Sequence, residues 1–118
     1  MDTCGHFARV VVVVASLATE RAWAQPPTLT PGQALYRRHC AGCHGANGGG
    51  DGMAAYFLFP KPRDFGSGKF RLVSTENGVP SESDLDSVLL RGMPGSSMPS
   101  WPHLTAEERA LLIKEVYR

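Results

Sequence analysis

Three segments of the chain carry the capping signals or apolar spacing of helices. They cover residues 31–42, 82–91 and 106–117. Thr30 and Thr105 each open a capping-box pattern, in which Gln or Glu follows three residues later, and the start at Ser81 is weaker. In the last two segments apolar side chains repeat on one helical face; these are Leu85, Val88 and Leu89, followed by Leu111, Leu112 and Val116. The pattern therefore predicts an all-α chain.

The 36 residues between His44 and Ser81 show little helical or strand periodicity. A loop of this length normally argues against a compact domain, unless something other than side chains supplies apolar surface. The triple glycine at 48–50 predicts a bare turn, because the Lys-Ser or Lys-Thr ending of a phosphate-binding loop is missing.

The first 24 residues are typical of a secretory signal peptide. Val10 to Ala18 is an apolar run of nine residues, which is too short to cross a bilayer. Ala22-Trp23-Ala24 fits a cleavage site, so we expect residues 1–24 to be removed and the mature domain to cover 25–118. This predicts an exported, periplasmic protein.

The composition and net charge limit the classes of function that the chain can have. The 118 residues are 42% hydrophobic and 19% charged, which indicates one folded domain. The net charge of +1 gives no support to nucleic-acid binding, and no apolar run is long enough to span a membrane. A mature domain this small and this rich in Gly and Pro would gain stability from a covalent cross-link.

The chemistry-bearing motif is Cys40-Ala41-Gly42-Cys43-His44. Its spacing allows haem attachment, a redox disulfide or half of a zinc site. A structural zinc needs four ligands, and the only other mature histidines are His39 and His103. A thioredoxin-like motif needs a β-α-β setting, which the pattern does not predict. His44 favours haem, because two thiols can form thioethers with its vinyl groups while the next imidazole binds iron.

At these residues the chain resembles the class I mono-haem c-type cytochromes, over Thr30 to Arg118. The resemblance is carried by three motifs at residues 36–45, 50–52 and 92–101. It implies a small class I cytochrome c fold of three to four helices, with long loops wrapped around one covalently bound haem c. It also implies that the first and last helices cross at Gly32 and Tyr36, and that the protein carries electrons and is not an enzyme.

The resemblance implies axial iron ligation by His44 and by the sulfur of a Met-Pro dipeptide. Both Met93 and Met98 precede a proline. Met98 is favoured, because the family's loop runs from a helix-ending Gly to the ligand and an aromatic residue, here Trp101, follows soon after. His103 is an alternative ligand, although a surface or capping role is favoured for it, and His39 is expected to be structural.

Other haem contacts are expected from the same resemblance. The second N–H of His44 should donate to a proline carbonyl, at Pro60 or Pro62. Candidate donors to the two haem carboxylates are Arg63, Lys69, Arg71 and Trp101. The apolar side chains expected to wrap the haem are Phe57, Leu58, Phe59, Phe65, Phe70 and Leu72.

The expected function is one-electron transfer between a donor and an acceptor protein, at a positive potential set by the thioether ligand. The sequence does not identify these partners. One alternative is a relay subunit of a larger periplasmic or membrane-associated oxidoreductase complex. Another is a catalytic haem protein, which would need an open sixth coordination position.

Overall fold

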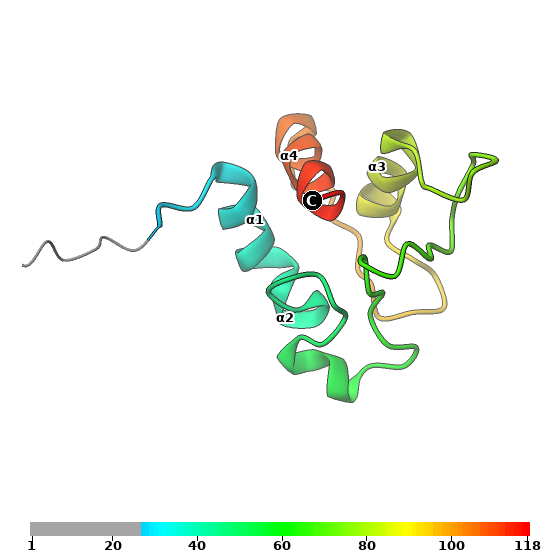
Figure 1. Ribbon diagram of the computed structural model, residues 1–118, viewed down its shortest axis with the longest axis horizontal. Coiled ribbons are helices and arrows are strands. Elements are labelled where there is room, and N and C mark those ends of the chain that lie inside the picture. The colour runs from blue at the N-terminus through cyan, green and yellow to red at the C-terminus, as the bar shows by residue number, and fades with distance from the viewer. Residues whose placement is uncertain (1–26) are drawn as a thin grey trace, which may run out of the picture.

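The computed structural model describes residues 27–118, so the expected signal peptide lies outside the described residues. Four α-helices and one 3-10 helix follow one another, and residues 27–118 contain no strand (Figure 1). They are α1 Pro31–His39, α2 Ala41–His44, the 3-10 helix η1 Met53–Phe57, α3 Glu82–Arg91 and α4 Ala106–Val116. The expected all-α fold with long loops is confirmed.

All three longer helices begin with a complete capping box. The hydroxyls of Thr30, Ser81 and Thr105 each accept a hydrogen bond from the backbone N–H three residues later. The side chain at that later position accepts in turn from the backbone N–H of the cap. The weaker signal at Ser81 therefore produces a cap as complete as the other two.

Asp84, which completes the cap of α3, also anchors the preceding loop. Its carboxylate accepts from the backbone N–H and the hydroxyl of Ser74, each at 3.0 Å, and from the backbone N–H of Ser81 at 2.8 Å. These bonds, first the one from the Ser74 backbone, lower the pKa of Asp84 from 3.8 to about 2. The end of the long loop is thereby fixed to the start of α3.

The first predicted helix is divided. The sequence predicts one helix over 31–42, whereas the structure ends α1 at His39 and begins α2 at Ala41. Cys40 between them has φ −116° and ψ −39°, outside the usual helical range, so the chain changes direction there. The short helix η1, which no periodicity indicated, packs against α2.

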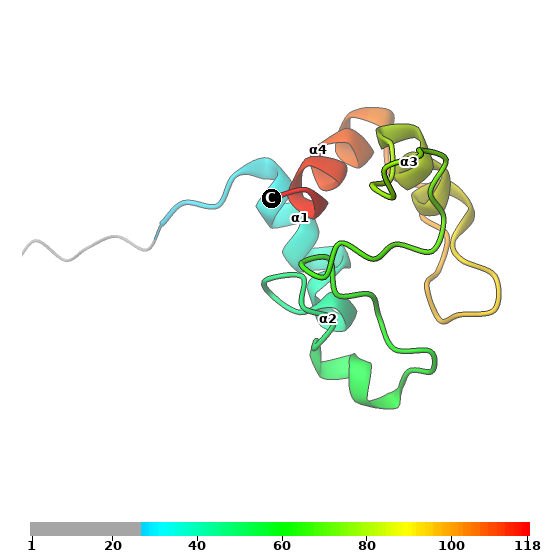
Figure 2. The same cartoon turned by 45° about the vertical axis from the view of Figure 1, so that its right-hand side comes forward.

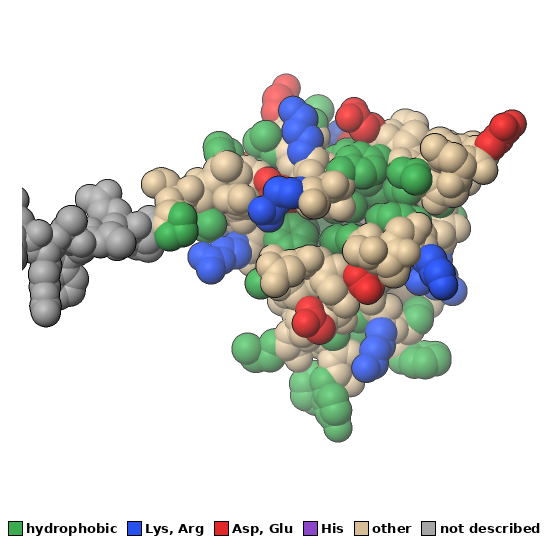
Figure 3. Space-filling view, viewed as in Figure 1, with side chains coloured by type: hydrophobic (Ala, Val, Ile, Leu, Met, Phe, Trp, Pro, Cys, Tyr) green, Lys and Arg blue, Asp and Glu red, His purple; other side chains and the backbone are tan. Residues whose placement is uncertain are grey.

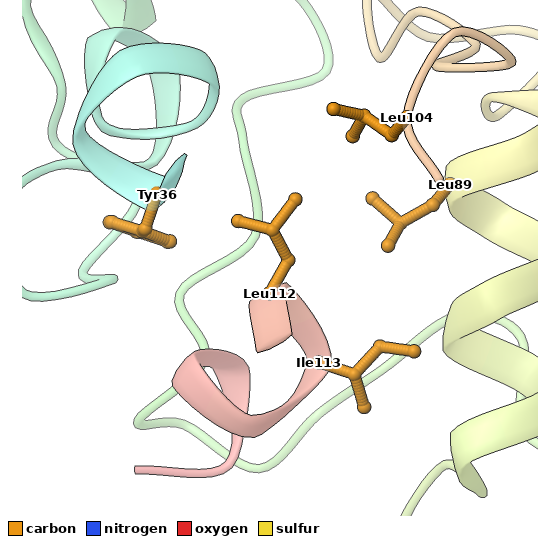
Figure 4. Close-up of a cluster of buried hydrophobic side chains, with 5 residues drawn as sticks. All are labelled: Tyr36, Leu89, Leu104, Leu112 and Ile113. Carbon is orange, nitrogen blue, oxygen red and sulfur yellow. The ribbon is translucent and has the colours of Figure 1, made fainter. Parts of the chain in front are cut away.

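Helix α4 packs on both α1 and α3 (Figures 1 and 2). The buried cluster at their meeting point consists of Tyr36, Leu89, Leu104, Leu112 and Ile113 (Figure 4). A Cβ at Gly32 would lie only 3.1 Å from the carbonyl oxygen of Leu111, so the absence of a side chain lets α1 and α4 approach closely. The expected crossing of the first and last helices at Gly32 and Tyr36 is confirmed.

An ion pair joins α3 to α4. Nε of Arg109 lies 2.6 Å from Oδ1 of Asp86, and the same guanidinium donates to the carbonyl of Leu104 at 2.8 Å. The Arg109 side chain is only 13% exposed, so water screens this pair less than a typical surface pair. Within residues 27–118, no helix is long and apolar enough to cross a membrane.

Candidate functional site

The buried cluster is one wall of a cavity of about 360 Å³. Four of its five side chains, those of Tyr36, Leu89, Leu112 and Ile113, also line the cavity. The rest of the lining comes from all four α-helices and from the loop segments 58–72 and 93–101. Most of the lining is apolar, and a volume of this size lies within the range of cofactor pockets, about 300–1,000 Å³. The helices therefore form a shell around a hollow.

The two cysteines and the histidine of the motif stand on the wall of this cavity. Cys40 lies at the junction of α1 and α2, while Cys43 and His44 end α2. Both thiols are free and partly buried. Burial raises the pKa of Cys40 to about 11, so this thiol is neutral at pH 7. Two unpaired thiols and one imidazole thus face the same apolar space.

His44 is held in one orientation. Its Nδ1 lies 3.1 Å from the carbonyl oxygen of Arg63, and its ring stacks on Phe65 with centroids 4.6 Å apart. Burial lowers the pKa of His44, and the bond to the Arg63 carbonyl opposes that shift only in part. The ring is therefore neutral at pH 7. With Nδ1–H donating to the carbonyl, the lone pair of Nε2 is available as a metal ligand.

The acceptor for His44 was expected to be the carbonyl of Pro60 or Pro62, and this expectation is wrong. A Cβ at Gly50 would lie 2.6 Å from the Pro62 carbonyl oxygen. The Pro62 carbonyl is therefore packed against the glycine turn at residues 48–50. The next carbonyl along, that of Arg63, faces the imidazole instead. Pro60, Pro62 and Arg63 all line the cavity, as expected for residues around a cofactor.

The 92–101 loop brings both candidate methionines to the cavity. Met93 and Met98 line it, and the backbone N–H of Met93 donates to the carbonyl of Met98 at 3.1 Å. A Cβ at Gly92 would lie 2.8 Å from that same carbonyl oxygen, which explains why glycine ends α3 here. Met98 also packs against the buried cluster. Either sulfur could serve as a soft ligand from this loop.

Trp101 carries a buried hydrogen-bond donor without a partner. Its side chain lines the wall, and its buried Nε1 has no hydrogen-bond partner among the described residues. A buried N–H without an acceptor is rare in folded proteins, so it indicates a missing partner. His39 also lines the cavity and lies edge-on to Trp101, with ring centroids 5.2 Å apart. His103 is exposed and outside the lining, which does not favour it as a ligand.

The expected wrapping side chains divide into two groups. Leu58, Phe65, Phe70 and Leu72 line the cavity. Phe57 and Phe59 do not, and they are 81% and 93% exposed, so the expectation was wrong for these two. Leu58 has an extended backbone, with φ −103° and ψ 136°, and neighbours in an extended chain point to opposite sides. Leu58 therefore faces inward while its neighbours face solvent.

Of the expected carboxylate donors, Arg63, Arg71 and Trp101 line the cavity and Lys69 does not. Sequence reasoning missed one polar contact of the site. The hydroxyl of Tyr36 donates to the carbonyl of Gly45 at 2.9 Å and joins α1 to the end of α2. Burial raises the pKa of Tyr36 to about 12, so the hydroxyl keeps its proton. No local pattern signals a bond between these positions, because it depends on the bend at Cys40.

The lining fits a haem on chemical grounds. The apolar walls suit a macrocycle, the two thiols suit thioether formation, and the imidazole and thioether sulfurs suit iron. The unpaired Trp101 N–H and the arginines suit its carboxylates. Among residues 27–118 no group of three or more His, Cys, Asp and Glu side chains could hold a metal ion by itself, which does not favour a structural zinc site.

Comparison with known proteins agrees with this chemistry. The family model of cytochrome c matches residues 29–114. No curated protein matches the chain. A solved structure, the Kuenenia stuttgartiensis reducing HAO-like protein complex Kustc0457/Kustc0458, contains a similar chain with 34% identity and a TM-score of 0.72. The match covers 77% of this chain and 42% of that one. This chain therefore belongs to the cytochrome c family, and its cavity residues fit the covalently bound haem c of that family.

Proposed function

We propose that this chain is an exported one-electron carrier whose haem is attached through Cys40 and Cys43 and ligated by His44 and Met98. The observation that carries the proposal is the placement of both thiols and the oriented imidazole on the wall of one apolar cavity, which the methionine loop also reaches. When bound, the haem iron supplies the one-electron couple. With His44 and Met98 both bound to the iron, no coordination site would be left for a substrate.

The protein residues set the properties of that couple. Nδ1–H of His44 donates to the Arg63 carbonyl, which fixes the ring and makes Nε2 a better donor to iron. The apolar lining keeps water away, and a thioether ligand favours the ferrous state. The apolar lining and the thioether ligand each raise the reduction potential, so we expect a positive midpoint potential. A strongly negative midpoint in a redox titration would contradict thioether ligation.

Met98 is proposed as the ligand because it packs against the buried cluster and lies in the loop that leads to Trp101. The test compares Met98→Ala with Met93→Ala in protein made with haem-maturation machinery. Met98→Ala should abolish the weak red absorption band of iron–thioether bonding in the oxidised protein, and Met93→Ala should retain it. Loss of the band in Met93→Ala alone would overturn the assignment.

A relay subunit of a larger complex is the second candidate. It is supported by the similarity to a chain of the HAO-like protein complex, of whose length this chain spans less than half. The native mass of the protein in a periplasmic extract distinguishes the two. A free carrier migrates as a small protein, whereas a relay subunit migrates with its complex. Rapid carbon monoxide binding by the ferrous protein would instead favour a catalytic haem with an open sixth position.

Export follows from the proposed signal peptide at residues 1–24, which matches the extracytoplasmic attachment of haem in c-type cytochromes. The test is N-terminal sequencing of the haem-bearing protein after cell fractionation. The expected result is a periplasmic protein beginning at Gln25. A cytoplasmic protein that retains Met1 would contradict the proposal.

A further inference from the structure

The largest exposed apolar side chains of the described residues gather in one short segment. Met53, Tyr56, Phe57 and Phe59 are 91%, 85%, 81% and 93% exposed, and we call them the η1 patch. The rings of Tyr56 and Phe57 touch edge to face, with centroids 5.1 Å apart. In Figure 3, hydrophobic side chains project from the lower end of the molecule, where Figure 1 shows the green segment containing η1.

The patch is too apolar to be explained as ordinary surface. Large apolar side chains present about 150–250 Å² each, so the four together expose roughly 600–700 Å². The largest apolar patch on a typical monomer covers about 300–600 Å² and is often a binding site. The fold does not require these side chains to be apolar, because none of the four belongs to the buried cluster or lines the cavity.

The lack of charge in the η1 patch and the area that it exposes favour a second copy of this chain as its binding partner. Residues 52–60 contain no charged side chain, so the segment offers nothing that would attract an acidic or basic partner. The chain's net charge of only +1 puts little repulsion between two copies, and a net charge near zero promotes association. Two patches facing each other would remove up to about 1,200–1,400 Å² from water, which exceeds the roughly 1,000 Å² that a specific interface needs.

We propose that the η1 patch is a self-association surface, through which two copies of this chain form a dimer. A two-fold contact uses the same patch on both copies, and the paired aromatic rings can interlock without any charged partner. Leu58, between the two exposed phenylalanines, lines the cavity. The contact therefore places the outer side of each cavity wall at the dimer interface.

The test is sedimentation equilibrium of the haem-loaded mature protein at concentrations from about 1 µM to about 1 mM. The wild type should shift from monomer to dimer mass. Phe57→Gln/Phe59→Gln should raise the dissociation constant at least about tenfold. The control Leu29→Gln/Val79→Gln changes two apolar side chains that are 41% and 49% exposed and lie outside the patch, and it should dimerise like the wild type.

Three results would overturn the proposal: a monomer throughout the range, equal dimerisation by the double phenylalanine variant, or a monomer that sediments with anionic lipid vesicles. The visible spectrum of each variant is recorded in parallel. A normal spectrum shows that the variant folds and binds haem. A colourless wild-type protein would contradict the proposed function without deciding the mass measurement, so the two proposals fail separately.

Discussion

The close packing of Gly52 against α2 predicts that a larger residue at this position would disturb the haem site. Gly52 is buried and has φ −59°, a value that any residue adopts, so only the space around it demands glycine. A Cβ there would lie 2.6 Å from the carbonyl oxygen of Ala41 and 2.6 Å from the carbonyl carbon of Cys43, and it would also meet the carbonyl oxygen of Gly42. All three atoms are backbone of α2, which cannot rotate away as a side chain can.

Gly52→Ala should therefore displace the helix that carries Cys43 and His44. The new methyl group is about 1 Å closer to α2 than van der Waals contact allows. Overpacking of this kind costs about 1–3 kcal/mol, which for a domain of this size lowers Tm by roughly 4–24 °C. The same displacement should reduce the fraction of chains that acquire haem.

The assay is thermal unfolding of the haem-loaded protein by circular dichroism, with haem content measured from absorbance. Gly42→Ala is the matched control, because it lies within α2 beside both cysteines and a Cβ there meets nothing within 4 Å. The free energy of unfolding of the control should equal that of the wild type or exceed it by up to about 1 kcal/mol, since alanine favours helix. If the free energy of unfolding of Gly52→Ala lies within about 0.5 kcal/mol of the wild-type value, the steric reasoning is refuted.

Three further predictions concern single polar groups. Tyr36→Phe should lower the free energy of unfolding by about 0.5–1.5 kcal/mol, because it removes the 2.9 Å hydrogen bond to the Gly45 carbonyl and leaves that oxygen only the 3.3 Å bond from the Gly48 N–H; Tyr56→Phe, at an exposed ring, should have no effect in the same denaturant titration. For Asp84, the folded pKa of about 2 lies below the unfolded value of 3.8, so its stabilising contribution is complete above pH 4 and is lost as the pH falls towards 2. The difference in denaturation midpoint between the wild type and Asp84→Asn should shrink across that interval, and a constant difference would contradict the assignment. Trp101→Phe should destabilise the haem-loaded protein by about 1–2 kcal/mol if the buried N–H donates to the cofactor. A variant at least as stable as the wild type would show that this donor has no partner there.

Much of the site and the helix boundaries could be predicted because the signals are local. Capping boxes act over three residues, and the structure contains all three boxes at Thr30, Ser81 and Thr105. The motif of two cysteines and a histidine is equally local, because its chemistry depends on positions within a single turn. The bend at Cys40 and the short helix η1 were missed, because neither changes the spacing of apolar residues that reveals a helix.

The direction in which loop residues face could not be predicted from sequence. Phe57, Leu58 and Phe59 are equally apolar along the chain, yet only Leu58 lines the cavity, because the extended backbone there turns alternate side chains to opposite sides. The acceptor for His44 is 19 residues away, and the packing of Gly50 against the preceding proline carbonyl decides that Arg63 fills this role.

The amino-acid sequence alone determined that this chain forms capped helices and carries two thiols and an imidazole within five consecutive residues, because those properties depend on neighbours a few residues apart. Only the tertiary structure decided which carbonyl orients His44, which aromatic residues stay in solvent and how closely α1 approaches α4. These outcomes depend on contacts between distant segments, which become defined once α4 packs against α1 and α3 and the loops close around the cavity.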